Sequence, residues 1–223
     1  EALETLPVLK REDLERKNKI IPIEVLEPEQ AKVLYHDLFT NGIVYLDLGF
    51  DLHALPRELL PLTEIFVRVN SLGTQWCHGD FAAVVAKGVD GIIVPKIESA
   101  GDLQTAEWLL GALERERGLP EGGIDLIPIV ETAAGFSNLA GIARAARRTK
   151  RLSFGAGDFT LDVGITWSRD ELELLPYRTA FVVESRAAGL EPPLDTVWVS
   201  LNDPEGFQRS VQRAKDLGFQ GKL

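Results

Sequence analysis

Three apolar runs of this sequence each end in a charged residue, and these charges are the first candidates for chemistry. The runs end at Arg68, Glu131 and Asp158. Continuous apolar runs are typical of strands covered on both faces, as in a parallel sheet with helices outside. A charge there is costly unless it is paired or binds something. One cation and two carboxylates at the carboxyl ends of such strands would suit a divalent metal and an anionic substrate.

The two carboxylates have a metal-binding and a structural interpretation. Mg²⁺ prefers hard oxygen ligands in an octahedron, and two carboxylates with water and substrate oxygens can supply them. Asp158 ends the stretch 155–158, where the small residues Gly155 and Gly157 let a ligand approach the backbone. Alternatively, either acid could cap the helix that follows its strand, since Asp is a favoured N-cap residue.

Arg68 and Lys96 are cations at the ends of two expected strands. The planar guanidinium of Arg68 suits bidentate binding of a substrate carboxylate, but it could equally form a structural ion pair, for which Asp47 is the candidate partner. Lys96 could form a Schiff base with a keto substrate. Its neighbours Pro95 and Glu98 favour charge pairing or a supporting role instead.

The elements that must position these residues alternate between short apolar runs and helical patterns, which indicates a parallel sheet built from βα units. Ser99 and Asp203 are expected helix N-caps. A helical turn or two is expected over residues 53–62. The expected strands cover residues 19–25, 42–47, 64–70, 91–96, 125–131, 151–156 and 196–199. The expected helices cover residues 29–39, 79–87, 100–117, 136–148, 170–188 and 204–217.

These strands predict an α/β fold of the TIM type. Seven strands are visible, and Gly221-Lys222-Leu223 could begin an eighth, which would close a (β/α)₈ barrel. We expect a single barrel domain over residues 1–223, with residues 1–18 as an N-terminal arm. The eighth strand and a C-terminal segment are expected to be cut short at the end of this sequence.

Composition excludes several classes of function. The net charge of -10 and the pI near 4.9 argue against a nucleic-acid partner, which would require a basic surface. The single cysteine, Cys77, rules out an internal disulfide and suits a reducing cytoplasm. No apolar stretch approaches the length of a membrane span, so no membrane contact is expected. The three scattered histidines have no zinc-binding spacing.

Five ordered stretches carry a resemblance to a known family. They are VRVN (67–70), GIIVPKIES (91–99), IPIVETAAG (127–135), FGAGDF (154–159) and the tail from 195 to 219. Together they resemble the citrate lyase β-subunit group of the HpcH/HpaI aldolase superfamily, which also contains malyl-CoA lyases. The resemblance extends from about residue 42 to the end of the sequence.

The resemblance implies a Mg²⁺-dependent carbon–carbon lyase or aldolase that acts on small keto or hydroxy acids or their CoA thioesters. By position, Glu131 and Asp158 would be the metal ligands. Arg68 would be the catalytic group that holds the substrate carboxylate, and Gly157 and Asp47 would also contact substrate. Mg²⁺ would polarise the carbonyl of a chelating keto acid while Arg68 sets its orientation. A homo-oligomer, trimer or hexamer, is implied as well.

The chain departs from the family pattern at two flanking acids, which leaves a second hypothesis open. Residues 47–51 read Asp-Leu-Gly-Phe-Asp where the family usually has Asp-Leu-Glu-Asp. Gly157 stands where the family's Gly-Ala-Glu-Asp-Phe has its glutamate. The alternative is therefore a catalytically degenerate barrel that acts as a binding or assembly protein.

Overall fold

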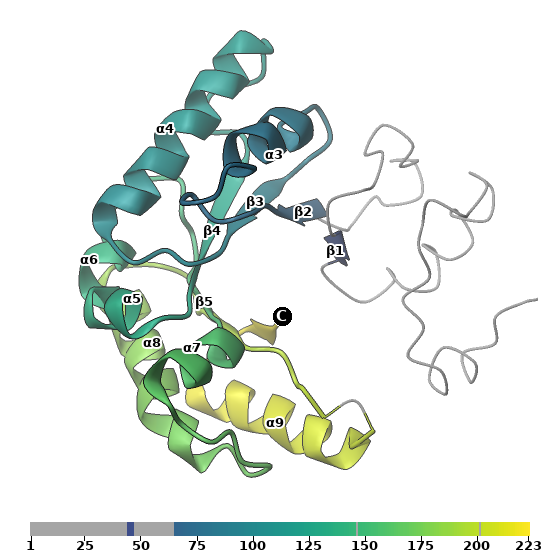
Figure 1. Ribbon diagram of the computed structural model, residues 1–223, viewed down its shortest axis with the longest axis vertical. Helices are drawn as coiled ribbons and strands as arrows, with labels where there is room; N and C mark the ends of the chain where they lie inside the picture. Colours follow the sequence, from purple (N-terminus) through teal and green to yellow (C-terminus); the bar gives the residue numbers. More distant parts are fainter. Residues whose placement is uncertain (1–43, 47–64, 146, 201) are drawn as a thin grey trace, which may run out of the picture.

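The computed structural model of the chain describes residues 44–46, 65–145, 147–200 and 202–223. Seven strands in these ranges form one sheet, in which neighbours in the chain are neighbours in space and every pair is parallel. The strands are β1 (Val44–Leu46), β2 (Ile65–Arg68), β3 (Gly91–Val94), β4 (Asp125–Val130), β5 (Ser153–Phe154), β6 (Leu194–Asp195) and β7 (Gly221–Lys222). Figure 1 shows the strands following a curve, so that the sheet forms a half-barrel.

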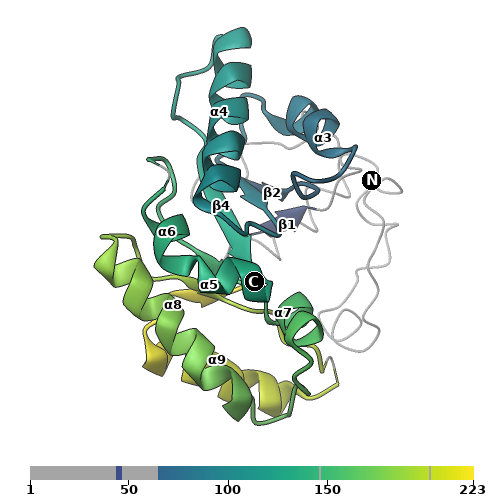
Figure 2. The same cartoon turned by 60° about the vertical axis from the view of Figure 1, so that its left-hand side comes forward.

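The helices lie in the connections between strands and form an arc outside the sheet (Figure 1). Figure 2 shows α8 and α9 side by side on this outer layer. Within the ranges above, no helix is both long enough and apolar enough to cross a membrane. The helices are α3 (Cys77–Val84), α4 (Ala100–Glu116), α5 (Ala133–Ser137), α6 (Leu139–Ala143), α7 (Ala156–Val163), α8 (Leu175–Ala187) and α9 (Pro204–Leu217), with a 3-10 turn, η5 (Leu172–Leu174), before α8.

Buried apolar side chains form two clusters, one on each face of the sheet. Because successive residues of a strand point to opposite faces, Ile92 and Ile93 belong to different clusters. The larger cluster joins the sheet to the outer helices, and Phe154 and Phe181 pack there with ring centroids 4.9 Å apart. The smaller cluster fills the inner face and consists of Phe66, Ile93, Ile127, Ile129 and Leu194, with Leu223 packed against it.

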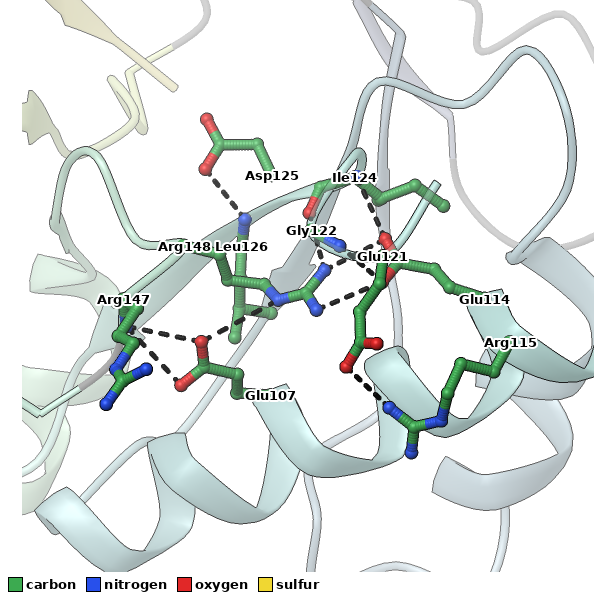
Figure 3. Close-up of polar contacts among 10 residues, drawn as sticks. All are labelled: Glu107, Glu114, Arg115, Glu121, Gly122, Ile124, Asp125, Leu126, Arg147 and Arg148. Carbon is green, nitrogen blue, oxygen red and sulfur yellow. Dashed lines mark hydrogen bonds and ion pairs between the residues drawn. The ribbon is translucent and has the colours of Figure 1, made fainter. Parts of the chain in front are cut away.

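A buried ion pair fixes the amino-terminal end of β4 to α4 (Figure 3). Glu114 accepts hydrogen bonds from Arg148 Nη1 and Nη2 at 2.9 and 3.0 Å. It also accepts from the backbone N–H groups of Gly122 and Ile124. Burial alone would raise the pKa of Glu114, but these donors outweigh it and lower the pKa. The position of β4 is thereby fixed at the end opposite to Glu131.

A second buried network joins β6 and β7 to the outer helices. The guanidinium of Arg178 lies between Asp195, at 2.9 Å, and Glu171, at 3.0 Å, and all three side chains are fully buried. Lys222 also pairs with Asp195, and Ser210 donates to Glu171 at 2.6 Å. Each buried carboxylate is therefore neutralised, as burial of charge requires.

The expected elements are confirmed in most of the described chain. Strands are present near 42–47, 64–70, 91–96, 125–131 and 151–156, as β1 to β5, and the final Gly-Lys forms β7. The N-caps Ser99 and Asp203 each accept a backbone hydrogen bond, from Asp102 and Gly206. The expected arm at 1–18, the strand at 19–25, the helix at 29–39 and the turn at 53–62 lie outside the described residues.

Three expectations were wrong in detail. The strand expected at 196–199 lies earlier in the chain, as β6, Leu194–Asp195. The charged Asp195 can be buried in this strand because its charge is compensated by partners that are distant in sequence. The helix expected at 136–148 is two short helices that meet at Asn138, whose side-chain amide donates to the carbonyl of Glu98 at 2.9 Å. Helix α7 was not expected, since its first turn contains Gly157.

Candidate functional site

Arg68, Glu131 and Asp158 line one cavity of about 430 Å³. Arg68 is the last residue of β2, Glu131 directly follows β4, and Asp158 lies in the first turn of α7, which follows β5. Carboxyl ends of parallel strands lie at the same edge of a sheet, so three distant stretches meet there. The structure thus brings the three predicted residues together. Their roles in metal and substrate binding remain predictions.

Strand alternation explains why these side chains face the cavity. Phe66 belongs to the inner cluster, so Arg68, two residues later, extends from the same face. Ile129 and Glu131 repeat this relation on β4. Arg68 and Glu131 therefore lie on the inner face of the sheet, directly beyond the apolar cluster. Phe154, Thr196, Val197 and Leu223 complete the wall with glycines 155 and 157.

Glu131 lies in an environment with too little positive charge to keep it fully ionised. Burial, together with the nearby charge of Asp158, raises its pKa to about 7. The Lys96 N–H, which donates to Glu131 Oε1 at 3.1 Å, and the charges of Lys96 and Arg68 offset this only in part. A buried carboxyl group with a raised pKa beside a second acid is an electrostatic environment that a bound cation would stabilise.

Neither acid serves as a helix N-cap, so the structural alternative for them is wrong. The N-cap of α5 is Thr132, whose side chain accepts from the Gly135 N–H at 3.1 Å. The N-cap of α7 is Gly155, which has no side chain to accept a hydrogen bond. Asp158 is instead in the first turn of α7, where the helix dipole favours a negative charge.

The two glycines of the site have different roles. A Cβ atom added to Gly155 would lie 2.5 Å from both Cβ and Oε2 of Glu131, closer than real Cβ atoms approach. A Cβ atom added to Gly157 would have only Trp167 Cζ3 nearby, at 4.0 Å. Gly155 therefore permits the position of Glu131, whereas Gly157 leaves open space in the cavity wall. The sequence pattern singled out Gly157 and gave no sign of the contact made by Gly155.

Lys96 connects the two acids. Its Nζ lies 2.9 Å from Asp158 Oδ2, and its backbone N–H is the donor to Glu131. The expected charge pairing is present, with Asp158 as the partner. The hydrogen bond with Asp158 and its charge raise the pKa of Lys96, so the amine stays protonated. A protonated amine is not a nucleophile, which argues against a Schiff base.

A second cavity, of about 520 Å³, shares Arg68, Glu131 and Asp158 with the first. Its other walls are polar and come mainly from the segment after β2, including Ser71 and Thr74, and from Lys96. Asn70 also lines it and donates from its backbone N–H and its side chain to Asp80 Oδ2, at 2.8 and 2.7 Å. Asn70 lies in the VRVN stretch, which is the signal in the sequence that could have identified this loop.

The donor set fits Mg²⁺. In the described part of the chain, no group of three or more His, Cys, Asp or Glu side chains could hold a metal ion. Mg²⁺ is usually bound by one or two carboxylates, with waters and substrate oxygens as the remaining ligands. Glu131 and Asp158 meet that requirement, and burial together with the neighbouring charge of Asp158 raises the pKa of Glu131, which a bound cation would offset. Asp47, the other expected substrate contact, lies outside the described residues.

A curved parallel sheet with acids and an arginine at its carboxyl edge is the arrangement in which β/α-barrel enzymes place their active sites. The chain belongs to the HpcH/HpaI aldolase/citrate lyase family, whose model matches residues 51–223. A second model, that of a peptidase-associated family, matches residues 1–76. Of that second range, only residues 44–46 and 65–76 are described.

Individual relatives agree with this assignment. The citrate lyase subunit beta of Leuconostoc mesenteroides subsp. cremoris is 38% identical over 160 residues, which cover 72% of this chain and 53% of the relative. A (3S)-malyl-CoA thioesterase of Cereibacter sphaeroides is 30% identical over 156 residues, 70% of this chain and 50% of the relative. The chain thus spans about half the length of the curated relatives it matches.

A solved structure provides a comparison in three dimensions. The citrate lyase beta subunit of M. tuberculosis, complexed with oxaloacetate and magnesium, superposes with a TM-score of 0.62 at 26% identity. The match covers 87% of this chain and 85% of that one. The described fold is therefore the fold of a protein that has been crystallised with a small keto acid and Mg²⁺.

Proposed function

We propose that this chain carries the active site of a Mg²⁺-dependent carbon–carbon lyase or aldolase that acts on a small keto or hydroxy acid or its CoA thioester. The observation that supports this most is the cavity where Glu131, Asp158 and Arg68 meet. The family membership and the relative bound to oxaloacetate and magnesium support the same reaction class.

In this proposal Glu131 and Asp158 hold the metal ion, with waters and substrate oxygens as its other ligands. The bound ion would supply Lewis-acid polarisation of the substrate carbonyl. The protein's own contribution is to hold the two acids side by side. Gly155 permits the close position of Glu131, and Thr196 accepts a hydrogen bond from the Ala156 N–H at 2.9 Å, which fixes the start of α7 and hence Asp158.

Arg68 is proposed to bind the substrate carboxylate. Its exposed guanidinium lines both cavities, and its fork can donate two parallel hydrogen bonds to a carboxylate. Holding the carboxylate fixes the orientation of the adjacent carbonyl toward the acids. Ile129 and Val197 add apolar surface to the cavity wall beside these charged groups.

The finer architecture is also a proposal. We infer that the half-barrel is part of a complete TIM-type (β/α)₈ barrel and that residues 1–223 form one domain. The sequential order of the seven parallel strands supports this, because a barrel of this type adds each strand beside the previous one. The proposal includes a cytoplasmic homo-oligomer, trimer or hexamer, with no nucleic-acid or membrane partner.

Calorimetric titration with pyruvate and oxaloacetate, with and without Mg²⁺, tests the proposed function. We expect binding only with the metal, and we expect E131Q to lose it. E98Q is the matched control, since Glu98 is exposed at the same edge and outside both cavities. Binding that is independent of Mg²⁺ and unchanged in E131Q would overturn the assignment. Metal-dependent binding without turnover of any keto acid or thioester would instead favour the binding or assembly protein.

A further inference from the structure

We propose that Lys96 is a tethered counter-ion that competes electrostatically with the divalent cation for Asp158, and so sets the affinity of the metal site. This inference rests on the proposed function, because it concerns the same two acids. The inference goes beyond the proposed function because it assigns control of the metal affinity to a third side chain.

The geometry gives Lys96 contact with both acids at once. The Nζ–Asp158 Oδ2 distance is 2.9 Å, and the backbone N–H lies 3.1 Å from Glu131 Oε1. These contacts join three strand ends, since Lys96 follows β3 while the acids follow β4 and β5. A positively charged group already lies where a divalent cation would be attracted.

The backbone of Lys96 makes one of its two contacts, and the side chain makes the other. Its φ is 55°, in the left-handed region that residues other than glycine rarely adopt. The N–H that faces Glu131 depends on this conformation, whereas the ammonium that faces Asp158 depends on the side chain. A substitution at the side chain can therefore remove the charge while the donor to Glu131 stays.

The ion pair is weak enough to be exchanged. The Lys96 and Asp158 side chains are 51% and 47% exposed, so water screens their attraction. The charged groups that act on the ammonium are the acids Asp158, Glu131 and Asp162. A divalent cation beside Asp158 would be attracted to the same acids with twice the charge and would repel the ammonium.

An ammonium group displaced from Asp158 would move into the second cavity. Lys96 and Arg68 both line the second, polar cavity, which also borders the two acids. Metal entry would thus move a positive charge toward the space that Arg68 already faces. The metal site and the proposed carboxylate site would in this way be coupled through one side chain.

The test is calorimetric titration of MgCl₂ into four full-length proteins at low ionic strength: wild type, K96Q, K96R and K150Q. K96Q removes the charge but keeps an unbranched side chain on the same backbone. K150Q is the matched control, because Lys150 is also about half exposed, at 55%, and pairs with an acid, Asp125, at 3.6 Å. Asp125 begins β4, whereas Glu131 follows its other end.

We expect K96Q to bind Mg²⁺ about three- to tenfold more tightly than wild type. K150Q should bind nearly like wild type, because the charge it removes lies at the opposite end of β4 from the two acids and the Coulomb energy falls with distance. K96R, which keeps the charge, should show no gain. If K96Q did not fold, K96G would replace it, because glycine adopts a positive φ without strain, and the same gain is expected.

The outcomes separate this inference from the proposed function. If wild type binds Mg²⁺ and D158N loses it, but K96Q and K96G bind with equal or lower affinity, the counter-ion role is wrong and the metal site stands. If neither wild type nor the Lys96 variants bind Mg²⁺, both proposals are overturned. A gain shared by K150Q would also overturn the inference, because net charge alone would then explain it.

Discussion

Gly155 lies so close to Glu131 that no side chain fits between them. A Cβ atom at position 155 would be 2.5 Å from Glu131 Cβ and Oε2, and 2.8 Å from Ile129 Cγ2. The residue that follows β5 therefore determines where the acid that follows β4 can lie. This contact joins the two strands at the point where the proposed metal ligands meet.

The first prediction concerns this contact. G155A should displace Glu131 and weaken Mg²⁺ binding by about tenfold or more, because the Cβ atom must push the carboxylate out of place. G141A is the control, since nothing lies within 4 Å of an added Cβ on that exposed helical glycine. Calorimetry of both variants should show the loss in G155A alone. Equal affinities would show that Glu131 can relax without consequence.

The second prediction concerns pH. Because the pKa of Glu131 is about 7, a proton competes with the metal below that value, and Mg²⁺ affinity should rise as pH increases from about 6 to 8. In the absence of metal, the raised pKa means that protonation of Glu131 stabilises the fold, and this contribution is lost as pH rises through about 7. Titrations across this range should show the rise in wild type. A flat profile would mean that Glu131 does not bind the metal.

The third prediction separates the substrate site from the metal site. R68K keeps the charge but loses the planar fork, so pyruvate binding in the presence of Mg²⁺ should weaken by about tenfold or more. Mg²⁺ binding alone should change little. Both affinities can be measured on the same protein by calorimetry. If R68K weakened only the metal, Arg68 would be a structural partner of the acids.

The fourth prediction concerns the buried network that holds β6 and β7. R178M would leave Glu171 and Asp195 buried without their shared partner, at a cost of about 3–5 kcal/mol in unfolding free energy. R144M is the control, because Arg144 forms an exposed pair with Glu184 at 3.4 Å and should cost about 0–1 kcal/mol. Urea unfolding followed by circular dichroism measures both. A small loss in R178M would mean that Lys222 compensates.

The sequence was sufficient to predict the parallel sheet and the meeting of three charges. Apolar runs with charged ends mark where the strands end, and parallel strands bring those ends to one edge. That is why Arg68, Glu131 and Asp158 could be placed together although the chain separates them widely. Caps such as Ser99 were predictable as well, because their partners are three residues away.

What could not be predicted depends on contacts between distant residues. The buried strand β6 could not be recognised because it contains the charged Asp195. The partner that neutralises this charge, Arg178, is on another element. The contact between Gly155 and Glu131 arises only when β4 and β5 pair. The hydrogen bond from the Lys96 N–H to Glu131 depends on a backbone φ of 55°, which no local pattern around Lys96 specifies.

The most direct test of the account is a crystal structure of the protein grown with Mn²⁺ and pyruvate, with anomalous data to locate the ion. We expect a single anomalous peak. It should lie within coordination distance of one carboxylate oxygen of Glu131 and one carboxylate oxygen of Asp158. Pyruvate should chelate that ion, with its carboxylate held by Arg68. A peak elsewhere, or pyruvate bound at the carboxyl edge without an ion between the two acids, would contradict it.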